Sequence, residues 1–331
     1  MEALTVIKPV EEQVPASVIT EIGPYLHKFI IDRDVKDNSR RVYLNNLQQF
    51  FTWVNQKGYL LSEISRGHII EYKAALLQAG KSTLTVSGYL SSIRCFFEWA
   101  EGNKIYPNIA KGVRAPKNKK EFRKLPLSID QTKQLHTYLQ QRAYGIDQPE
   151  AIHGLNLSEV QNYVIINLIL RMGLRCIEVA RLNVEDIGYI NGNRVMGIRG
   201  KGYDGISRTI RVPDSVYKPL QKYLRLRCNP SQGPVFISLS NHDRGTRITT
   251  RSISRIAKTA LRAIGIDDRA ITAHSLRHTM ATNAKRSGAT TEQIQHDLGH
   301  ASIDTTQLYT KIMQAEERLN NSAIMLIDNL F

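Results

Sequence analysis

Apolar and aromatic residues recur at helical spacing through the first third of this chain, and this periodicity is the strongest constraint on its fold. It predicts four helices, at 17–31, from residue 38 or 39 to Gly58, at 66–78, and from Ser82 onward. In the second and fourth helices the apolar face carries Tyr43, Leu44, Leu47, Phe50, Phe51, Val54, Val86, Tyr89, Leu90, Ile93, Phe96, Phe97 and Ala100. We assign these side chains to a shared core, so residues 16–113 should form a small all-α bundle after a lead-in over 1–15.

A basic segment after the bundle predicts a boundary between two domains. Residues 114–125 include the run APKNKKEFRK, contain Pro116 and end just before Pro126. Such a composition is typical of a linker, and its lysines suit a DNA phosphate backbone. A solvated surface loop is the alternative interpretation.

The rest of the chain, 126–331, mixes helices with a little strand. Runs at 194–198 and 209–212 flank the glycine-rich sequence GKGYDG and predict a β-hairpin. Helical patterns occur at 128–141, 158–171, 175–182, 214–227, 250–264, 274–287, 291–298 and 303–318. The predicted fold class is mainly α with a small antiparallel β-sheet in the second domain.

Positive charge is spread along the whole chain. The net charge is +15 at pH 7, and by residue count 1–125 contribute +7 and 126–331 contribute +8. We therefore expect a polyanion that contacts both domains, and double-stranded DNA fits best.

Several other classes are disfavoured. No apolar run approaches the ~20 residues of a membrane-spanning helix, and the N-terminal sequence lacks the pattern of a secretory signal. Three widely spaced cysteines, Cys95, Cys176 and Cys228, indicate neither a disulfide framework nor a zinc site. We expect a cytoplasmic, nucleoid-associated protein with no membrane partner, no metal and no cofactor.

Five residues at fixed offsets point to phosphodiester chemistry. His274 and Arg277 stand in HSLRH, His300 in LGH, Tyr309 in TTQLYT, and Arg175 about a hundred residues upstream. Guanidinium groups suit the non-bridging oxygens of a phosphodiester because each stays charged and offers a planar fork of donors. The two arginines could therefore clamp one phosphate without a metal.

Cleavage also requires a nucleophile and a proton for the leaving oxygen. The Tyr309 phenol has an ordinary pKa near 10, so its proton must be accepted, and the two histidines could do this. Lys201, at the tip of the glycine-rich hairpin, could protonate a departing 5′ oxygen. Arg199 or Arg208 could contact the phosphate from this hairpin instead.

The motifs resemble those of the tyrosine recombinase (phage integrase) family. The likeness lies in RMGLRCIEVARL at 171–182, HSLRHTMAT at 274–282, LGHASIDTTQLYT at 298–310 and the hairpin lysine. Residues 16–113 are similar, less specifically, to the family's core-binding domain. Against this pattern, residues 142–157 look like an insertion.

The resemblance implies a role for each matching residue. Tyr309 is the expected nucleophile, which forms a 3′-phosphotyrosine, and Lys201 the general acid toward the 5′-hydroxyl. Glu178 occupies the acidic position that orients the site. The phosphate-binding and proton-handling set is expected to be Arg175, His274, Arg277 and His300. The family needs neither ATP nor a metal.

The family also implies an assembly, a C-shaped two-domain clamp on DNA that works as a homo-tetramer. Residues 323–331, from Ala323 to Phe331, are expected to dock on a neighbouring protomer or to pack on their own domain. Base readout could come from any of two or three helices that present basic residues, including Arg251, Arg255, Lys258 and Arg262, so the DNA sequence that is read stays open.

The biological subtype stays open at this point. The short N-terminal lead-in favours a compact recombinase over the large phage-type integrases. The insertion and the long hairpin favour a recombinase of a transposon or other mobile element. A Xer-like resolver of chromosome or plasmid dimers is the alternative. Rivals of other classes are a non-catalytic DNA-binding regulator on the same scaffold and a type IB topoisomerase.

Overall fold

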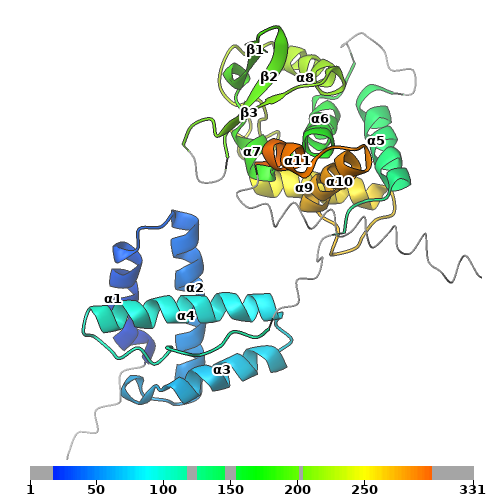
Figure 1. Cartoon of the computed structure of the whole chain (residues 1–331). Coiled ribbons are helices and arrows are strands. Elements are labelled where there is room, and N and C mark those ends of the chain that lie inside the picture. Colours follow the sequence, from blue (N-terminus) through cyan, green and yellow to red (C-terminus); the bar gives the residue numbers. More distant parts are fainter. Residues whose placement is uncertain (1–17, 118–124, 146–153, 201–203, 300–331) are drawn as a thin grey trace, which may run out of the picture. The chain divides into compact units, whose positions relative to one another are not determined.

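The computed structural model describes residues 18–117, 125–145, 154–200 and 204–299 of the chain (Figure 1). The chain folds into two compact units, Met1–Glu121 and Phe122–Phe331. The border between the units falls within the segment 114–125.

The first unit is a helical bundle, as the apolar spacing predicts. Its elements are α1 (Val18–Asp32), α2 (Asp37–Gln56), a 3-10 turn (Leu61–Glu63), α3 (Arg66–Gln78) and α4 (Thr83–Gly102). Ser82 caps α4, because its side-chain oxygen accepts a hydrogen bond from the backbone nitrogen of Thr85 at 3.2 Å. The phenylalanines of the predicted apolar faces are buried and pack edge to face. The ring centroids of Phe50 and Phe51 are 5.1 Å apart, and those of Phe51 and Phe96 are 5.6 Å apart. The predicted core of the bundle is confirmed.

The second unit combines helices with one small sheet. Its elements are α5 (Ile129–Tyr144), α6 (Leu157–Met172), α7 (Cys176–Arg181), a 3-10 turn (Val184–Asp186), β1 (Ile187–Ile190), β2 (Asn193–Ile198), β3 (Arg208–Arg211), α8 (Asp214–Leu226), α9 (Thr250–Ala263), α10 (Ala273–Arg286) and α11 (Thr291–Leu298). The predicted fold class, mainly α with a small antiparallel sheet, is confirmed. The helix predicted at 303–318 lies outside the described residues.

The sheet contains one strand more than the sequence predicted. Its order is β1-β2-β3, all antiparallel, with Ile187 opposite Met196 and Ile198 opposite Arg208. β1 and β2 are joined through Asn191 and Gly192, which both have positive φ, at 49° and 73°. An Asn-Gly pair between apolar runs is a strong hairpin signal, and it marks the missed strand.

Helix α6 is the centre of the second core. Most of its residues from Val160 to Met172 are buried, because α5, α8, α9 and α10 pack around it. The helix ends at Gly173, whose φ of +65° reverses the chain directly after the core. The residues that follow Gly173 are therefore fixed to the core by a short connection.

Within the described residues, no helix combines the length and the apolar composition that crossing a membrane requires.

Candidate active site

Arg175 and Glu178 lie at the start of α7, immediately after the core helix α6. Leu174 is fully buried and anchors the connection. Arg175 is the N-cap residue of α7, and the Glu178 carboxylate accepts a hydrogen bond from the Arg175 backbone nitrogen at 2.8 Å. A carboxylate at a helix N-terminus is favoured because it satisfies a backbone N–H that has no partner within the helix. This local capping fixes the position of Glu178.

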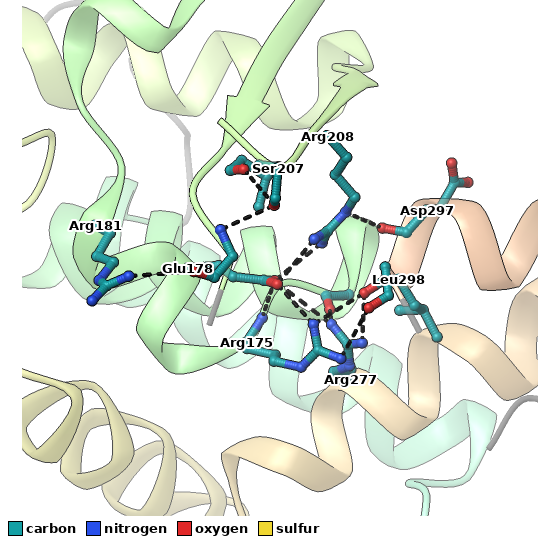
Figure 2. A network of polar contacts seen from close by, with 12 residues as sticks. Arg175, Glu178, Arg181, Ser207, Arg208, Arg277, Asp297 and Leu298 are labelled. Carbon is teal, nitrogen blue, oxygen red and sulfur yellow. Dashed lines mark hydrogen bonds and ion pairs between the residues drawn. The ribbon is translucent and has the colours of Figure 1, made fainter. Parts of the chain in front are cut away.

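Three guanidinium groups surround the Glu178 carboxylate (Figure 2). Arg175 donates to Oε1 at 2.8 Å, and Arg208 donates to Oε1 and Oε2 at 3.0 and 3.1 Å. The third, Arg277, lies 3.7 Å from Oε2. The Glu178 side chain is fully buried, with none of its surface exposed. The four side chains together carry a net charge of +2.

Backbone carbonyls hold the two arginines that the sequence assigned to the phosphate. Arg277, on α10, donates to the carbonyl oxygens of Gly173 at 2.6 Å and Leu298 at 2.7 Å, and its side chain is only 1% exposed. Arg175 donates to the carbonyl oxygens of Leu298 and Gly299, both at 3.3 Å, and keeps 29% of its side chain exposed. Figure 2 shows both guanidiniums beside Leu298. Arg175, Glu178 and Arg277, which are 102 residues apart from first to last in the sequence, thus meet at one place.

Steric crowding explains why residue 299, in the LGH motif, is a glycine. Gly299 ends α11 with a φ of +60°, a conformation that favours glycine. A Cβ atom at this position would lie 2.6 Å from Nη1 and 2.9 Å from Cζ of Arg208. A side chain at residue 299 would therefore displace Arg208 from its place against Glu178.

The remaining predicted site residues are only partly placed. His274 lies in the first turn of α10, three residues before Arg277, and is exposed. Its ring meets that of the buried His278 edge to face, with centroids 4.5 Å apart. Lys201, His300 and Tyr309, as well as the tail from Ala323 to Phe331, lie outside the described residues.

The two hairpin arginines point to different partners. Arg199 makes a bidentate ion pair with Asp186, with N–O distances of 2.8 and 2.7 Å. Arg208, at the start of β3, donates from Nε to the Asp297 carbonyl at 3.0 Å in addition to its two bonds to Glu178. Both guanidiniums are held by protein acceptors, Arg199 by Asp186 and Arg208 by Glu178 and the Asp297 carbonyl. The link between Arg208 and Glu178 was missed in the sequence, where the strand was predicted to begin one residue later.

The environment of Glu178 keeps its carboxyl group ionised. Burial favours the neutral form, but hydrogen bonds from Arg208 and Arg175 and the positive charges of Arg208 and Arg277 outweigh it, so the pKa of Glu178 lies below its ordinary value. The described residues contain no cluster of histidine, cysteine, aspartate and glutamate side chains that could hold a metal ion.

The lowered pKa of Glu178 predicts how this residue affects stability. Its contribution is present above the unfolded carboxyl pKa of about 4.3 and is lost as the pH falls through the lower folded value. At pH 7, Glu178→Gln should lower the free energy of unfolding by about 3–5 kcal/mol, because it leaves buried guanidiniums without their counter-charge. Urea denaturation from pH 7 to 3 should show this difference shrinking below about pH 4. The exposed Glu185, changed to glutamine, should cost only about 1 kcal/mol. Parallel curves for wild type and Glu178→Gln would contradict the assignment.

Comparisons with known proteins identify the family. The sequence profile of the phage integrase family matches residues 149–316, and that of its N-terminal SAM-like domain matches residues 22–104. Tyrosine recombinase XerC of Thermodesulfovibrio yellowstonii is 30% identical over 302 residues, which cover 88% of this chain and 91% of that protein. Tyrosine recombinase XerD of Oceanobacillus iheyensis is 29% identical over 89% of this chain and 94% of that protein.

Solved structures share the fold. XerH site-specific recombinase bound to palindromic difH substrate, in a post-cleavage complex, aligns with a TM-score of 0.70 at 18% identity, over 96% of this chain and 91% of that one. The Tn1549 transposon integrase in complex with transposon right end DNA aligns with a TM-score of 0.64 at 19% identity, over 93% of this chain and all of that one. At these identities the likeness is one of fold. With the family profile matching half of the chain and a relative at 30% identity along its length, the chain belongs to the phage integrase family and is a site-specific tyrosine recombinase.

Proposed function

We propose that this enzyme cleaves and rejoins DNA strands through a 3′-phosphotyrosine intermediate, with Arg175 and Arg277 binding the scissile phosphodiester. The observation that carries the proposal is the cluster around Glu178, whose four side chains have a net charge of +2. A phosphodiester has one negative charge, and charge on its non-bridging oxygens increases during attack. Two preorganised guanidiniums stabilise that charge without rearranging.

In the proposed step, the Tyr309 phenolic oxygen attacks phosphorus and the bond from phosphorus to the 5′ oxygen breaks. Either His274 or His300 accepts the single phenolic proton, both histidines stabilise the attacking geometry, and Lys201 gives a proton to the departing 5′ oxygen. The protein–DNA bond conserves the energy of the phosphodiester, so a free 5′-hydroxyl can reverse the step and join a new strand. No nucleotide is consumed in this scheme.

Duplex DNA is the proposed partner. Both units of one protomer are proposed to contact the duplex and so to clamp it. The positive charge in both parts of the sequence supports this. In the second unit, α9 presents Arg251 and Arg255 as exposed side chains, whereas Lys258 and Arg262 pair with Asp267 at 2.9 and 2.8 Å. We propose Arg251 and Arg255 as the groups on α9 that contact DNA, in a tetramer linked by the tail from Ala323 to Phe331. We further propose that it works in the cytoplasm, on the nucleoid.

The nucleophile is tested with a suicide substrate, a duplex nicked so that the cleaved strand end is lost. Wild type should form an adduct that survives SDS, and Tyr309→Phe should form none, because the attacking oxygen is absent. As a control, Tyr189→Phe, which changes an exposed tyrosine of β1, should form the adduct at the wild-type level. An adduct with Tyr309→Phe would assign the nucleophile to another residue.

The general acid is tested by changing the leaving group. Lys201→Ala should cleave ordinary DNA more slowly by about 10²- to 10⁴-fold, because the 5′ oxygen leaves unprotonated. With a bridging 5′-phosphorothiolate the leaving thiolate needs no proton, so cleavage should return to near the wild-type rate. Continued loss on that substrate would move the acid role away from Lys201.

For the biological role, we propose a recombinase of a transposon or other mobile element. The insertion at 142–157 and the long hairpin around Lys201 support this choice. A Xer-type role in resolving chromosome or plasmid dimers is the second candidate, and it is supported by the XerC and XerD relatives that match along nearly their whole length.

The two roles leave different DNA products in the cell. A mobile-element recombinase should produce an excised circle, whose junction is amplified by outward-facing primers and is absent after Tyr309→Phe. A Xer-type resolver should give no circle, and its deletion should instead raise the fraction of dimeric chromosomes or plasmids. Detection of dimers without a circle would overturn the mobile-element proposal.

A further inference from the structure

Glu178 creates an electrostatic conflict in the site as proposed above. Its carboxylate orients Arg175 and Arg277, yet the same negative charge weakens the attraction of these arginines for a phosphodiester. With only these three side chains the net charge would be +1, and the carboxylate would offset one of the two phosphate-binding guanidiniums. The third guanidinium, that of Arg208, resolves the conflict.

We propose that Arg208 is a positioning residue that neutralises Glu178, so that Arg175 and Arg277 keep two positive charges for the scissile phosphodiester. This inference rests on the proposed function of the site. It concerns Arg208 as a counter-charge to Glu178 rather than as a contact to DNA.

The geometry of Arg208 supports a role as counter-charge. It takes both oxygens of Glu178, Oε1 at 3.0 Å and Oε2 at 3.1 Å, in the parallel arrangement that makes arginine–carboxylate pairs strong. Arg175 shares only Oε1 through its side chain, and Arg277 stands 3.7 Å from Oε2. Arg208 is therefore the principal ion-pair partner of Glu178.

Burial separates Arg208 from Arg175, the more exposed of the two arginines that we assign to the phosphate. Its side chain is 9% exposed and its Nε is used by the Asp297 carbonyl at 3.0 Å, whereas Arg175 keeps 29% of its side chain exposed. Figure 2 shows Arg208 reaching Glu178 from the sheet, while Arg175 and Arg277 approach the carboxylate from the helical side. In low-dielectric surroundings a charge pair of this kind acts strongly on its neighbours.

The same side chain joins elements that carry other site residues. Arg208 begins β3, on the C-terminal side of the hairpin that contains Lys201, and Asp297 lies in the last turn of α11, three residues before His300. Its bonds to Glu178 and to the Asp297 carbonyl thus connect β3, α7 and α11 at one point. We expect loss of Arg208 to affect cleavage more than DNA binding, because Arg208 is proposed to act on Glu178 and not on the DNA itself.

A double-mutant cycle separates charge balance from simple structural support. Arg208→Met should slow formation of the covalent adduct by about 10- to 100-fold, as expected when a partner of substrate-binding groups is removed. Arg208→Lys keeps the positive charge but not the two parallel N–H donors, so it should slow adduct formation by less than Arg208→Met does. The double variant Arg208→Met with Glu178→Gln removes both charges of the pair, restores a net charge of +2 and should recover adduct formation by about tenfold over Arg208→Met. Adduct rates are measured on the suicide substrate at saturating protein, with thermal unfolding of each variant as a check of folding.

A second ion pair, between residues that directly flank strands of the same sheet, provides the matched control. Arg199 and Asp186 form a bidentate pair that does not touch Glu178, so Arg199→Met with Asp186→Asn should show no recovery over Arg199→Met. The inference would be overturned if the double variant lost as much adduct-forming activity as the two single changes together. It would also be overturned if Arg208→Met formed the adduct as fast as wild type. If Arg208→Met does not fold, the rates of adduct formation by Arg208→Lys and by the folded double variant still decide. Charge balance requires both of these variants to cleave, so failure of either one would contradict it. An inactive wild type would instead overturn the proposed function.

Discussion

A buried carboxylate needs compensation, and in this enzyme the compensation of Glu178 organises the part of the site that the structure describes. Transfer of one ionised group into the interior is costly unless it is paired and hydrogen bonded, and Glu178 is paired with guanidiniums from α7, β3 and α10. Each of these three elements is thereby fixed relative to the others. Arg175 and Arg277, the arginines proposed to bind the phosphate, consequently have defined positions before DNA arrives, which is what catalysis by preorganised charge requires.

Much of this architecture could be predicted from the sequence. The helical spacing of apolar residues predicted the bundle around Phe50 and Phe96, because core positions must repeat with the period of the helix. The motifs around Arg175 and Arg277 were recognisable because each lies in a short local pattern. Both arginines and Glu178 do meet in the structure, as expected for one site.

What the sequence did not reveal depends on contacts between distant elements. In the sequence, nothing distinguishes Arg208 from other arginines at the end of a strand. Its partner Glu178 lies 30 residues away and its other partner, the Asp297 carbonyl, lies 89 residues away. β1 was overlooked since four residues are too few to show periodicity, although the Asn191-Gly192 turn marked it. The steric demand on Gly299 likewise exists only once Arg208 is in place.

The carbonyl oxygens at the end of α11 have a consequence for regulation. The last carbonyls of a helix have no partners within it, and here the Leu298 oxygen accepts from Arg175 and Arg277, so these two arginines act as a C-terminal cap of this helix. α11 has only eight residues and rests on a small apolar cluster of Ala281, Ile294 and Leu298. Local opening of α11 would therefore remove the Leu298 acceptor from both arginines, while their contacts with Glu178 and Gly173 lie outside this helix. A ligand that binds one conformation of α11 more tightly than another would therefore also bias the hydrogen bonding of both arginines.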